Sequence, residues 1–453
     1  MRRIAIVVGS AMLVFLSACK PAENEDDQKT HDLIRNEHAL AKTLLHNEWI
    51  SIPLLMSSSY SDLRNLVISE LDEKCSNSQE SLQKLNDIDL CWSALMYEFL
   101  LEAGIRSYQQ LMIMSLDDFR NTIIDLNAKN TDFPIAELQG MNNDRNLNIA
   151  CNWWFYKNSQ TKLIIDKLNN VAGSNPSFNI KDNENKGMDV LRIVKADEDY
   201  VYLGVYHAMA NENQFKLYLA GSNDLKTWIR IAELGDRSHQ GDIKKWGNGY
   251  LVANEQDPVQ GSNNIQIRYY SSYSNLVDNK PANTKSIPQT FSTLAEGTPD
   301  IRKIEGSSPS NSHILIGYHY YDNGIKDQLA IGILQNFSNW RTWKDVISNR
   351  NIQEMGFTGN IGGRSGFIHS GNYVIQEAQI TPGDWGSWRF LFGDRAFYYL
   401  LQPVTPQRSV SFANPGVSPV DTNVFGVSGF MHSAGNSNGE IGELLYTIDL
   451  NSK

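Results

Sequence analysis

Acidic and histidine side chains recur at corresponding places in five consecutive repeats, which run from about residue 187 to the C-terminus. Each repeat opens with a short polar cluster and contains two β-rich runs, the second ending in charged or aromatic residues. Several carboxylates in one cleft suit glycosidic cleavage, because one must donate a proton to the leaving oxygen while another activates water or attacks carbon. The openings contain Asp189, Asp242, Glu296, Asp300 and Arg364, and the ends of the second runs contain His207, Glu255, His319, Tyr320, Glu377, Gln379 and His432.

The length of the repeat indicates which elements must position these side chains. Each repeat spans roughly 50 residues, and a period of this size built from several strands is typical of a β-propeller. One four-stranded blade cannot bury both of its faces alone, so blades pack in a ring. We therefore predict a mainly β fold, with a five-bladed β-propeller over residues 187–453 and a small all-α domain before it. The strand starts and ends named above should then meet at one mouth, where close carboxylates drive each other's pKa values apart.

Two phrases at the ends of repeats carry a family resemblance. Ser222-x-Asp224-Leu225-x-x-Trp228 follows an outer strand of the first repeat, and residues 337–343 take the same place in the third. This pattern resembles the turn of five-bladed glycoside hydrolases, such as the arabinanase and β-xylosidase group and its fructosidase relatives. Asp224 is expected to hydrogen-bond its own turn, and Trp228 to pack between blades. These phrases therefore argue for the fold more than for an activity.

A third phrase bears on residue roles. Residues 296–301, Glu-Gly-Thr-Pro-Asp-Ile, resemble the Glu-Gly-Pro segment that carries the general acid in that hydrolase group, and residues 240–243 loosely resemble its Pro-Asp-Ile segment. The family's segment opens the fourth blade, whereas here it opens the third repeat. The resemblance covers about 60% of the chain and implies an inverting enzyme, whose acid and base would lie about 6.5–9.5 Å apart.

The gathered carboxylates, together with this resemblance, suggest a set of catalytic roles, which we state as a hypothesis. Asp189 would be the general base and Glu296 the general acid, while Asp242 or Asp300 would raise the pKa of the acid. No cofactor is expected, although calcium or another metal ion at the mouth is an alternative. Acidic residues at strand starts also tie down turns, and that structural role competes for each of these residues.

Six further residues are predicted to bind substrate, and several of them have a competing explanation. Three histidines in alternate repeats could stack on sugars, form structural hydrogen bonds or hold a metal ion. Arg364 could bind a ligand carboxylate or pair with Glu377. Trp385 and Trp388 could form a sugar-stacking rim or pack within a blade. The predicted substrate-binding residues are His207, Glu255, His319, Arg364, Glu377 and Trp385.

The N-terminus indicates export. Residues 1–18 have a positive start and a short apolar run, which predicts a signal peptide. The segment ends in Leu-Ser-Ala-Cys, which resembles a bacterial lipobox and implies a lipidated (palmitate-bearing) Cys19. An ordinary secretory signal is the alternative. Lys20 after the cysteine implies the outer membrane, facing the periplasm or the cell surface. Residues 19–30 are polar and are expected to form a tether.

Residues 31–175 have periodic apolar positions that predict a helical accessory domain, followed by a linker over residues 173–185. Cys75 and Cys91 could form a disulfide in an exported chain, which would leave Cys151 unpaired. No Cys-x-x-Cys pair is present, so a structural zinc site is not expected.

The net charge of the chain limits the classes of molecule that it is expected to bind. Without residues 1–18 the chain has 38 basic and 51 acidic residues and no basic block. Nucleic acid is therefore excluded as a partner, because phosphate binding needs clustered Lys and Arg. We expect a monomer that binds an oligo- or polysaccharide and is attached to the membrane through its lipid. Two functions stay open: a glycoside hydrolase, or a carbohydrate-binding or scaffolding lipoprotein without catalysis.

Overall fold

The computed structural model describes residues 39–45, 48–75, 82–83, 159–211, 214–257, 263–322, 325–368, 372–394 and 397–451. The predicted signal peptide, the tether and three of the cysteines (Cys19, Cys91 and Cys151) lie outside these residues, so lipidation at Cys19 and the Cys75–Cys91 disulfide stay predictions. No helix of the described part is both long and apolar enough to cross a membrane.

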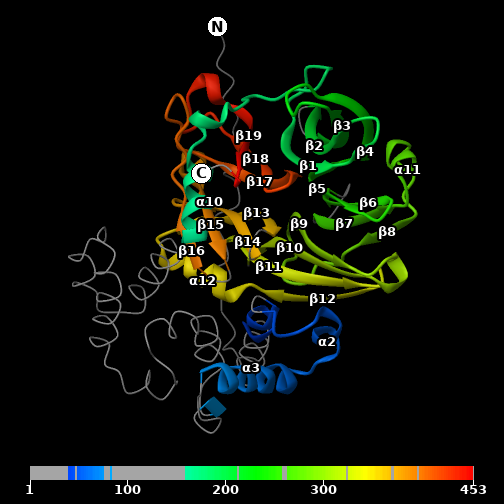
Figure 1. Ribbon diagram of the computed structural model, residues 1–453, viewed down its shortest axis with the longest axis vertical. Coiled ribbons are helices and arrows are strands. Elements are labelled where there is room, and N and C mark those ends of the chain that lie inside the picture. Colours follow the sequence, from blue (N-terminus) through cyan, green and yellow to red (C-terminus); the bar gives the residue numbers. More distant parts are fainter. Residues whose placement is uncertain are drawn as a thin grey trace, which may run out of the picture.

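Five antiparallel sheets follow one another along the chain and form a closed ring (Figure 1). Each innermost strand contacts the innermost strand of the next sheet, and the last of them, β17, contacts β1. The predicted five-bladed propeller is therefore confirmed. The first three blades are β1 (Asp189–Lys195), β2 (Tyr202–Asn211), β3 (Gln214–Ser222) and β4 (Ile229–Asp236), then β5 (Ser238–Trp246), β6 (Gly249–Gln256), β7 (Asn264–Tyr270) and β8 (Asn283–Ser286), then β9 (Glu296–Glu305), β10 (His313–Asp322), β11 (Lys326–Gln335) and β12 (Asn339–Lys344). The last two are β13 (Ile361–Ile368), β14 (Asn372–Gln379), β15 (Trp388–Asp394) and β16 (Phe397–Leu400), then β17 (Ala413–Asp421), β18 (Val424–Met431) and β19 (Gly442–Asp449).

The fifth blade has three strands of its own, and residues before the first blade complete it. Ser177 and Leu445 of β19 exchange two backbone hydrogen bonds of 2.8 and 2.9 Å, and the Ile180 amide donates to the Glu443 carbonyl at 3.3 Å. Asp182 then accepts hydrogen bonds from the Tyr206 hydroxyl of blade one and from Arg230. The linker predicted at residues 173–185 is therefore wrong. This segment pairs with the open edge of β19 and joins the two ends of the ring, because an unpaired edge would leave ladder groups unsatisfied.

Apolar clusters between neighbouring blades form the core. Trp228 is buried among residues of blades one and five, including Ile193, Val420 and Leu445. Asp224 Oδ1 accepts hydrogen bonds from the amides of Lys226 (2.8 Å) and Thr227 (2.7 Å). Both predictions made for the first turn phrase are confirmed.

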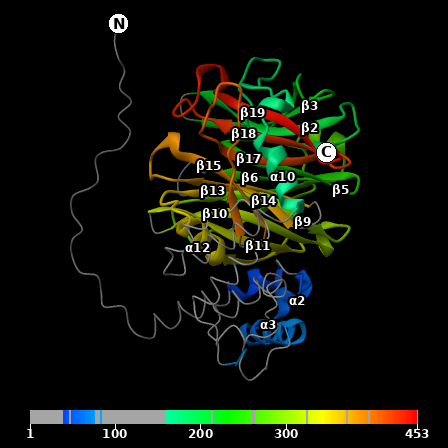
Figure 2. The ribbon, with the colours of Figure 1, turned by 60° about the vertical axis from the view of Figure 1, so that its left-hand side comes forward.

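The described helices cover parts of the ring. The predicted small helical part is present as residues 39–45, α2 (Ile52–Ser57) and α3 (Tyr60–Cys75), which lie beside the third blade (Figures 1 and 2). In contrast, α10 (Ser159–Asn169) lies against the fifth blade, where the Leu168 carbonyl accepts a hydrogen bond from the Tyr446 hydroxyl at 2.9 Å. The α-helices are α2 (Ile52–Ser57), α3 (Tyr60–Cys75), α10 (Ser159–Asn169), α11 (Tyr273–Val277) and α12 (Val346–Glu354), and the 3-10 turns are η1 (Ala172–Ser174), η2 (Pro309–Asn311), η3 (Trp385–Ser387) and η4 (Asn438–Glu440).

A β-bulge at the same place in every innermost strand sets the register of the mouth. The ladder to the second strand shifts by one residue within a four-residue stretch near the start of each innermost strand, and we number the positions of this stretch one to four. The second position has a left-handed backbone in four blades, at Val190, Gln240, Thr298 and Asn414. The equivalent first positions are Asp189, His239, Gly297, Ile361 and Ala413, and the equivalent fourth positions are Arg192, Asp242, Asp300, Arg364 and Gly416.

This register changes the correspondence that the sequence pattern indicates. Asp189 is equivalent to His239, whereas Asp242 is equivalent to Arg192 and lies deeper in the channel. Three residues on the second strands, His207, Glu255 and His319, pair with first positions and are equivalent to one another. His432 lies just beyond β18 and is therefore not equivalent to His207 and His319.

Candidate functional site

The mouth of the propeller gathers first-position residues and their partners on the second strands. Asp189 pairs with His207 across β1 and β2, and His239 pairs with Glu255 across β5 and β6. In blade three, His319 pairs with Gly297, the residue after Glu296. Because each first strand starts where its second strand ends, these side chains from three blades lie at the same end of the ring.

Acceptor side chains at the mouth join consecutive blades. The amide at the left-handed bulge position cannot donate to its own ladder, so a side chain of the preceding blade accepts its hydrogen bond. The joints are His207 Nδ1 with the Gln240 amide (3.2 Å), Glu255 Oε2 with the Thr298 amide (3.1 Å), Glu377 Oε2 with the Asn414 amide, and Glu443 Oε2 with the Val190 amide (3.0 Å). Burial lowers the pKa of His207 to about 3, so its ring is neutral and can accept. Three of the predicted substrate-binding residues, His207, Glu255 and Glu377, therefore also hold the ring together.

Asp242 and Asp300 belong to a second, deeper set of joints. Asp242 Oδ2 accepts a hydrogen bond from the Ile301 amide of the next blade at 2.7 Å, and Asp300 Oδ1 accepts one from the Gly366 amide at 3.1 Å. The two residues are only 1% and 2% exposed. Burial raises the pKa of Asp242, against the attraction of Lys244. Their positions suit inter-blade joints and a long-range effect on charges at the mouth better than direct contact with a ligand.

Glu296 is buried at the start of β9 and holds the preceding loop. Its Oε1 accepts hydrogen bonds from the backbone amides of Thr290 (2.8 Å), Phe291 and Ser292 (3.0 Å). Burial raises the pKa of Glu296, while the three amides and His319 lower it. Since all three amides bind Oε1, the second oxygen is the atom on which this carboxyl group can hold a proton.

Asp189 has the least engaged carboxylate of the predicted catalytic residues. Within the described part of the chain, no group forms a hydrogen bond with its carboxylate. Burial raises the pKa of Asp189 to about 6. The nearby Glu443 has a pKa raised well above its usual range, first by burial and then by the charge of Asp189. Asp189 can therefore gain or lose a proton near neutral pH without breaking a structural contact.

A second group of titratable residues lies around His319. Its Nε2 is 3.9 Å from Asp327 Oδ1, and its Nδ1 is buried with no hydrogen-bond partner among the described residues. Burial raises the pKa of Asp327. Burial also raises the pKa of Glu377 to about 7, against the amides of Asn414 and Gly363.

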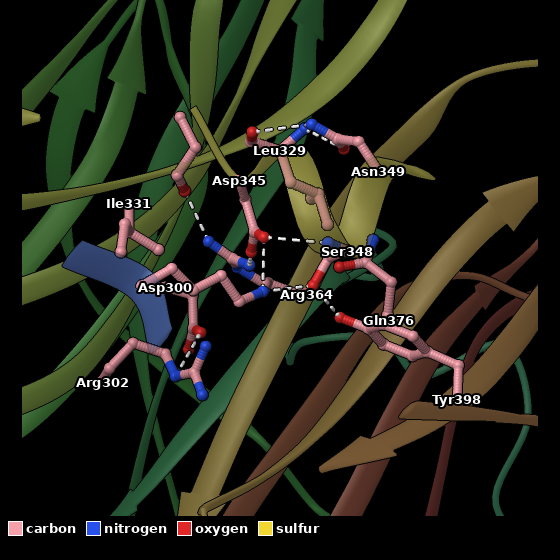
Figure 3. A network of polar contacts seen from close by, with 12 residues as sticks. Asp300, Arg302, Leu329, Ile331, Asp345, Ser348, Asn349, Arg364, Gln376 and Tyr398 are labelled. Atoms are coloured by element: carbon pink, nitrogen blue, oxygen red, sulfur yellow. Dashed lines mark hydrogen bonds and ion pairs between the residues drawn. The ribbon is translucent and has the colours of Figure 1, made fainter. Parts of the chain in front are cut away.

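Arg364 lies in a buried polar network (Figure 3). Its Nη1 lies 3.0 Å from Asp345 Oδ2, and its Nη2 donates to the Ala330 carbonyl. Lys42, from the helical residues 39–45, contacts the same Asp345 and Ser348 of α12. Both expected partners of Arg364, a ligand and Glu377, are replaced by Asp345, and only 2% of Arg364 is exposed.

The rim of the mouth between blades four and five has an aromatic surface. Trp385 in η3 is 49% exposed and stacks on His432, with ring centroids 4.9 Å apart and an interplanar angle of 26°. Trp388, at the start of β15, is buried. Each of the two predicted roles therefore belongs to one tryptophan: Trp385 exposes a ring face at the rim, and Trp388 packs within its blade.

Sequence reasoning did not select four titratable residues of this region: His239, Asp257, Asp327 and Glu443. His239 immediately precedes the Gln240–Ile243 opening, and recognition of the bulge would have placed it opposite Glu255. Asp257 follows β6, Asp327 lies near the start of β11, and Glu443 lies on a third strand, outside the strand ends used to select residues.

The chain matches no protein-family model and no curated protein. Solved structures with a similar arrangement include a thermostable family-43 glycoside hydrolase, at 12% identity and a TM-score of 0.40, covering 60% of this chain and 92% of that one. The endo-arabinase from Bacteroides thetaiotaomicron has 12% identity and a TM-score of 0.39, with coverage of 61% and 99%. The GH43_1 enzyme from Xanthomonas citri complexed with xylotriose has 8% identity and a TM-score of 0.39, with coverage of 63% and 92%. The blade count rests on the strand pairing of this chain, and the comparisons assign no residue roles.

Proposed function

We propose that the mouth of this propeller binds an oligo- or polysaccharide and hydrolyses its glycosidic bonds. The observation that carries the proposal is Asp189, a partly buried carboxyl group with a pKa of about 6 and no structural hydrogen bond among the described residues. A general base with this pKa is mostly ionised at neutral pH and can take a proton from water.

The proton donor in this proposal is Glu296. Burial raises its pKa, and its Oε1 is held by three amides, which leaves Oε2 to carry the proton. Two carboxyl groups in different environments can divide the roles of acid and base, as glycosidic cleavage requires. Asp242 and Asp300 act in this scheme through their charges, because burial and inter-blade hydrogen bonds keep them from the substrate.

The aromatic rim supports carbohydrate as the ligand. The exposed face of Trp385 is supported by the stacked ring of His432 and provides the kind of surface on which a pyranose or furanose ring packs. We further propose that the mature chain is a monomer attached to the outer membrane through a lipid on Cys19. That part of the proposal rests on the N-terminal sequence.

A second candidate function is carbohydrate binding without hydrolysis. The use of Glu255, Glu377, Asp242 and Asp300 as inter-blade joints favours it, because a carboxylate that holds the ring together cannot easily change its protonation. Under this alternative, Asp189 and Glu296 would contribute only polar contacts to a bound sugar.

One experiment separates the two functions. The exported part of the chain is incubated with plant, algal and bacterial polysaccharides, and both product release and binding are measured for the wild type, Asp189→Asn and Glu296→Gln. Glu305→Gln is the matched control, since Glu305 lies at the opposite end of β9 from Glu296. Hydrolysis that both mouth variants lose and Glu305→Gln keeps supports the enzyme. Binding without product supports the second candidate, and no binding to any glycan contradicts both.

A further inference from the structure

Three side chains of the second blade bring one nitrogen and two oxygen atoms together at the mouth. His239 Nε2 lies 2.9 Å from Asp257 Oδ1 and 3.8 Å from Glu255 Oε1, and the three ligand atoms lie within 4.8 Å of one another. His239 and Glu255 are direct partners in the ladder between β5 and β6. Asp257 follows two residues after Glu255, and its amide donates to the Arg237 carbonyl at 2.8 Å.

These separations suit a metal ion. An ion held about 2.0–2.2 Å from each of three nitrogen and oxygen ligands places those ligands about 3.0–3.5 Å apart, and the two measured separations lie on either side of that range. Imidazole favours zinc and its neighbours in the transition series, whereas calcium and magnesium favour sites made of oxygen alone. We propose that His239, Glu255 and Asp257 form a divalent-cation site that takes Zn²⁺ in preference to Ca²⁺ or Mg²⁺.

The ligand side chains are held in place by neighbours that do not compete for the ion. Glu255 Oε1 accepts a hydrogen bond from Asn263 Nδ2 at 2.7 Å, and its Oε2 accepts one from the Thr298 amide at 3.1 Å. The His239 ring contacts His207 and Phe215, with centroids 5.8 and 5.6 Å away. Outer partners of this kind orient metal ligands and reduce the ordering needed when the ion binds.

The charges around the site also favour a cation. Asp327 of blade three adds a further carboxylate that repels Glu255. Among the described residues, the cations of the channel are engaged elsewhere: Arg364 with Asp345, and Arg192 with the Asn414 carbonyl. A bound dication would offset this repulsion. Three protein ligands leave at least one coordination position for water or a sugar hydroxyl, so the site goes beyond the proposed hydrolysis and does not depend on it.

The test measures metal binding by the full exported chain after metal has been removed by chelation. Zn²⁺ is titrated by calorimetry, and Co²⁺ serves as a spectroscopic probe of the same site. We expect one saturable site per chain, at least a tenfold weaker response to Ca²⁺ and Mg²⁺, and at least tenfold weaker Zn²⁺ binding in His239→Gln and Asp257→Asn. His313→Gln is the matched control, because His313 starts β10 at the opposite end of the propeller and contacts Gln335. Glu255 is left unchanged since it also joins two blades.

Thermal unfolding of each variant shows whether it is folded. If a variant does not fold, the wild-type Co²⁺ spectrum decides: visible bands of a four- or five-coordinate ion support the site, and the spectrum of hydrated Co²⁺ contradicts it. The proposal is overturned if the stripped chain binds no Zn²⁺ saturably, if folded His239→Gln and Asp257→Asn bind like the wild type, or if Ca²⁺ binds more tightly than Zn²⁺. None of these results depends on glycan cleavage, so failure of this site and failure of the proposed function are distinguishable.

Discussion

Individual carboxyl groups at this mouth differ in what their oxygen atoms contact. Glu255 and Glu377 each accept a hydrogen bond from a backbone amide of the next blade. Glu296 accepts hydrogen bonds from three amides of the loop before it. The carboxylate of Asp189 has no hydrogen bond among the described residues. A hydrogen bond from an amide stabilises the ionised form, while burial opposes it. Asp189 experiences burial alone, which makes it the residue whose protonation can follow pH most freely.

We therefore predict that glycan hydrolysis depends on the ionisation of Asp189. The pKa of this group is raised to about 6, so the basic form predominates above that value and is lost below it. The value of kcat/KM should rise about tenfold per pH unit below about pH 6 and level off above it. Asp189→Asn should remove most of the activity together with this limb of the profile, and Glu305→Gln should keep both. An unchanged acidic limb in a residually active Asp189→Asn would show that another group is the base.

At the level of elements, a one-residue bulge in each innermost strand determines how neighbouring blades are joined. The bulge turns a backbone amide out of its ladder toward the preceding blade. Because this amide is buried, a side chain of that blade must accept its hydrogen bond. The acceptor differs from joint to joint, being a histidine ring at Gln240 and a carboxylate at Thr298, Asn414 and Val190. Each joint between blades therefore requires a hydrogen-bond acceptor at this position, but it does not require a particular residue type.

The joint that closes the ring gives a stability prediction. The two oxygens of Glu443 accept the amides of Val190 and Leu191, each at 3.0 Å, across the contact between blades five and one. Glu443→Ala would leave two buried amides without acceptors, so we expect the free energy of unfolding to fall by about 2–5 kcal/mol. Urea denaturation measures the loss. Glu305→Ala should change stability by less than about 0.5 kcal/mol, because the ion pair between Glu305 and Lys303 is partly exposed to solvent. Equal losses in the two variants would contradict this role for Glu443.

For the molecule as a whole, the buried network of Figure 3 connects the N-terminal helical residues to the ring. Lys42, Arg302 and Arg364 are buried with two carboxylates, Asp300 and Asp345. Burial lowers the pKa of Lys42 to about 8, despite its contact with Asp345. Beside this network, Arg341 of the third blade donates to the carbonyls of residues 55, 56 and 58, which fixes α2 against the ring.

This arrangement predicts unequal effects of removing the two partners of one ion pair. Asp345→Asn would leave Lys42 and Arg364 without their shared anion, and we expect a loss of about 3–5 kcal/mol in the free energy of unfolding. Lys42→Met should lose less than half as much, since Asp345 keeps its contact with Arg364. Guanidinium denaturation followed by tryptophan fluorescence provides the comparison. A larger loss in Lys42→Met would show that the lysine, not the shared anion, is the main support of the contact.

Much of the architecture could be predicted from the residues in order along the chain. Strand-length apolar runs, turn residues and the phrase ending at Trp228 are local signals, because alternating burial and turn formation depend on residues close in sequence. Their repetition predicts both the number of blades and the end of the ring at which polar side chains gather. The net negative charge without a basic block is also a property of composition.

The contacts of the individual side chains required the folded ring. The ladder between the first and second strands of each blade decides which residues are equivalent, and in this ladder Asp189 matches His239, three residues before Asp242. Arg364 pairs with Asp345, which the packing of blades three and four brings near, and residues near Ser177 complete the fifth blade because ring closure brings them beside Leu445. The local sequence pattern determines which segments of the chain form the strands of a blade. The hydrogen-bond acceptor of a given amide and the partner of a given charged group depend on the side chains of the neighbouring blade.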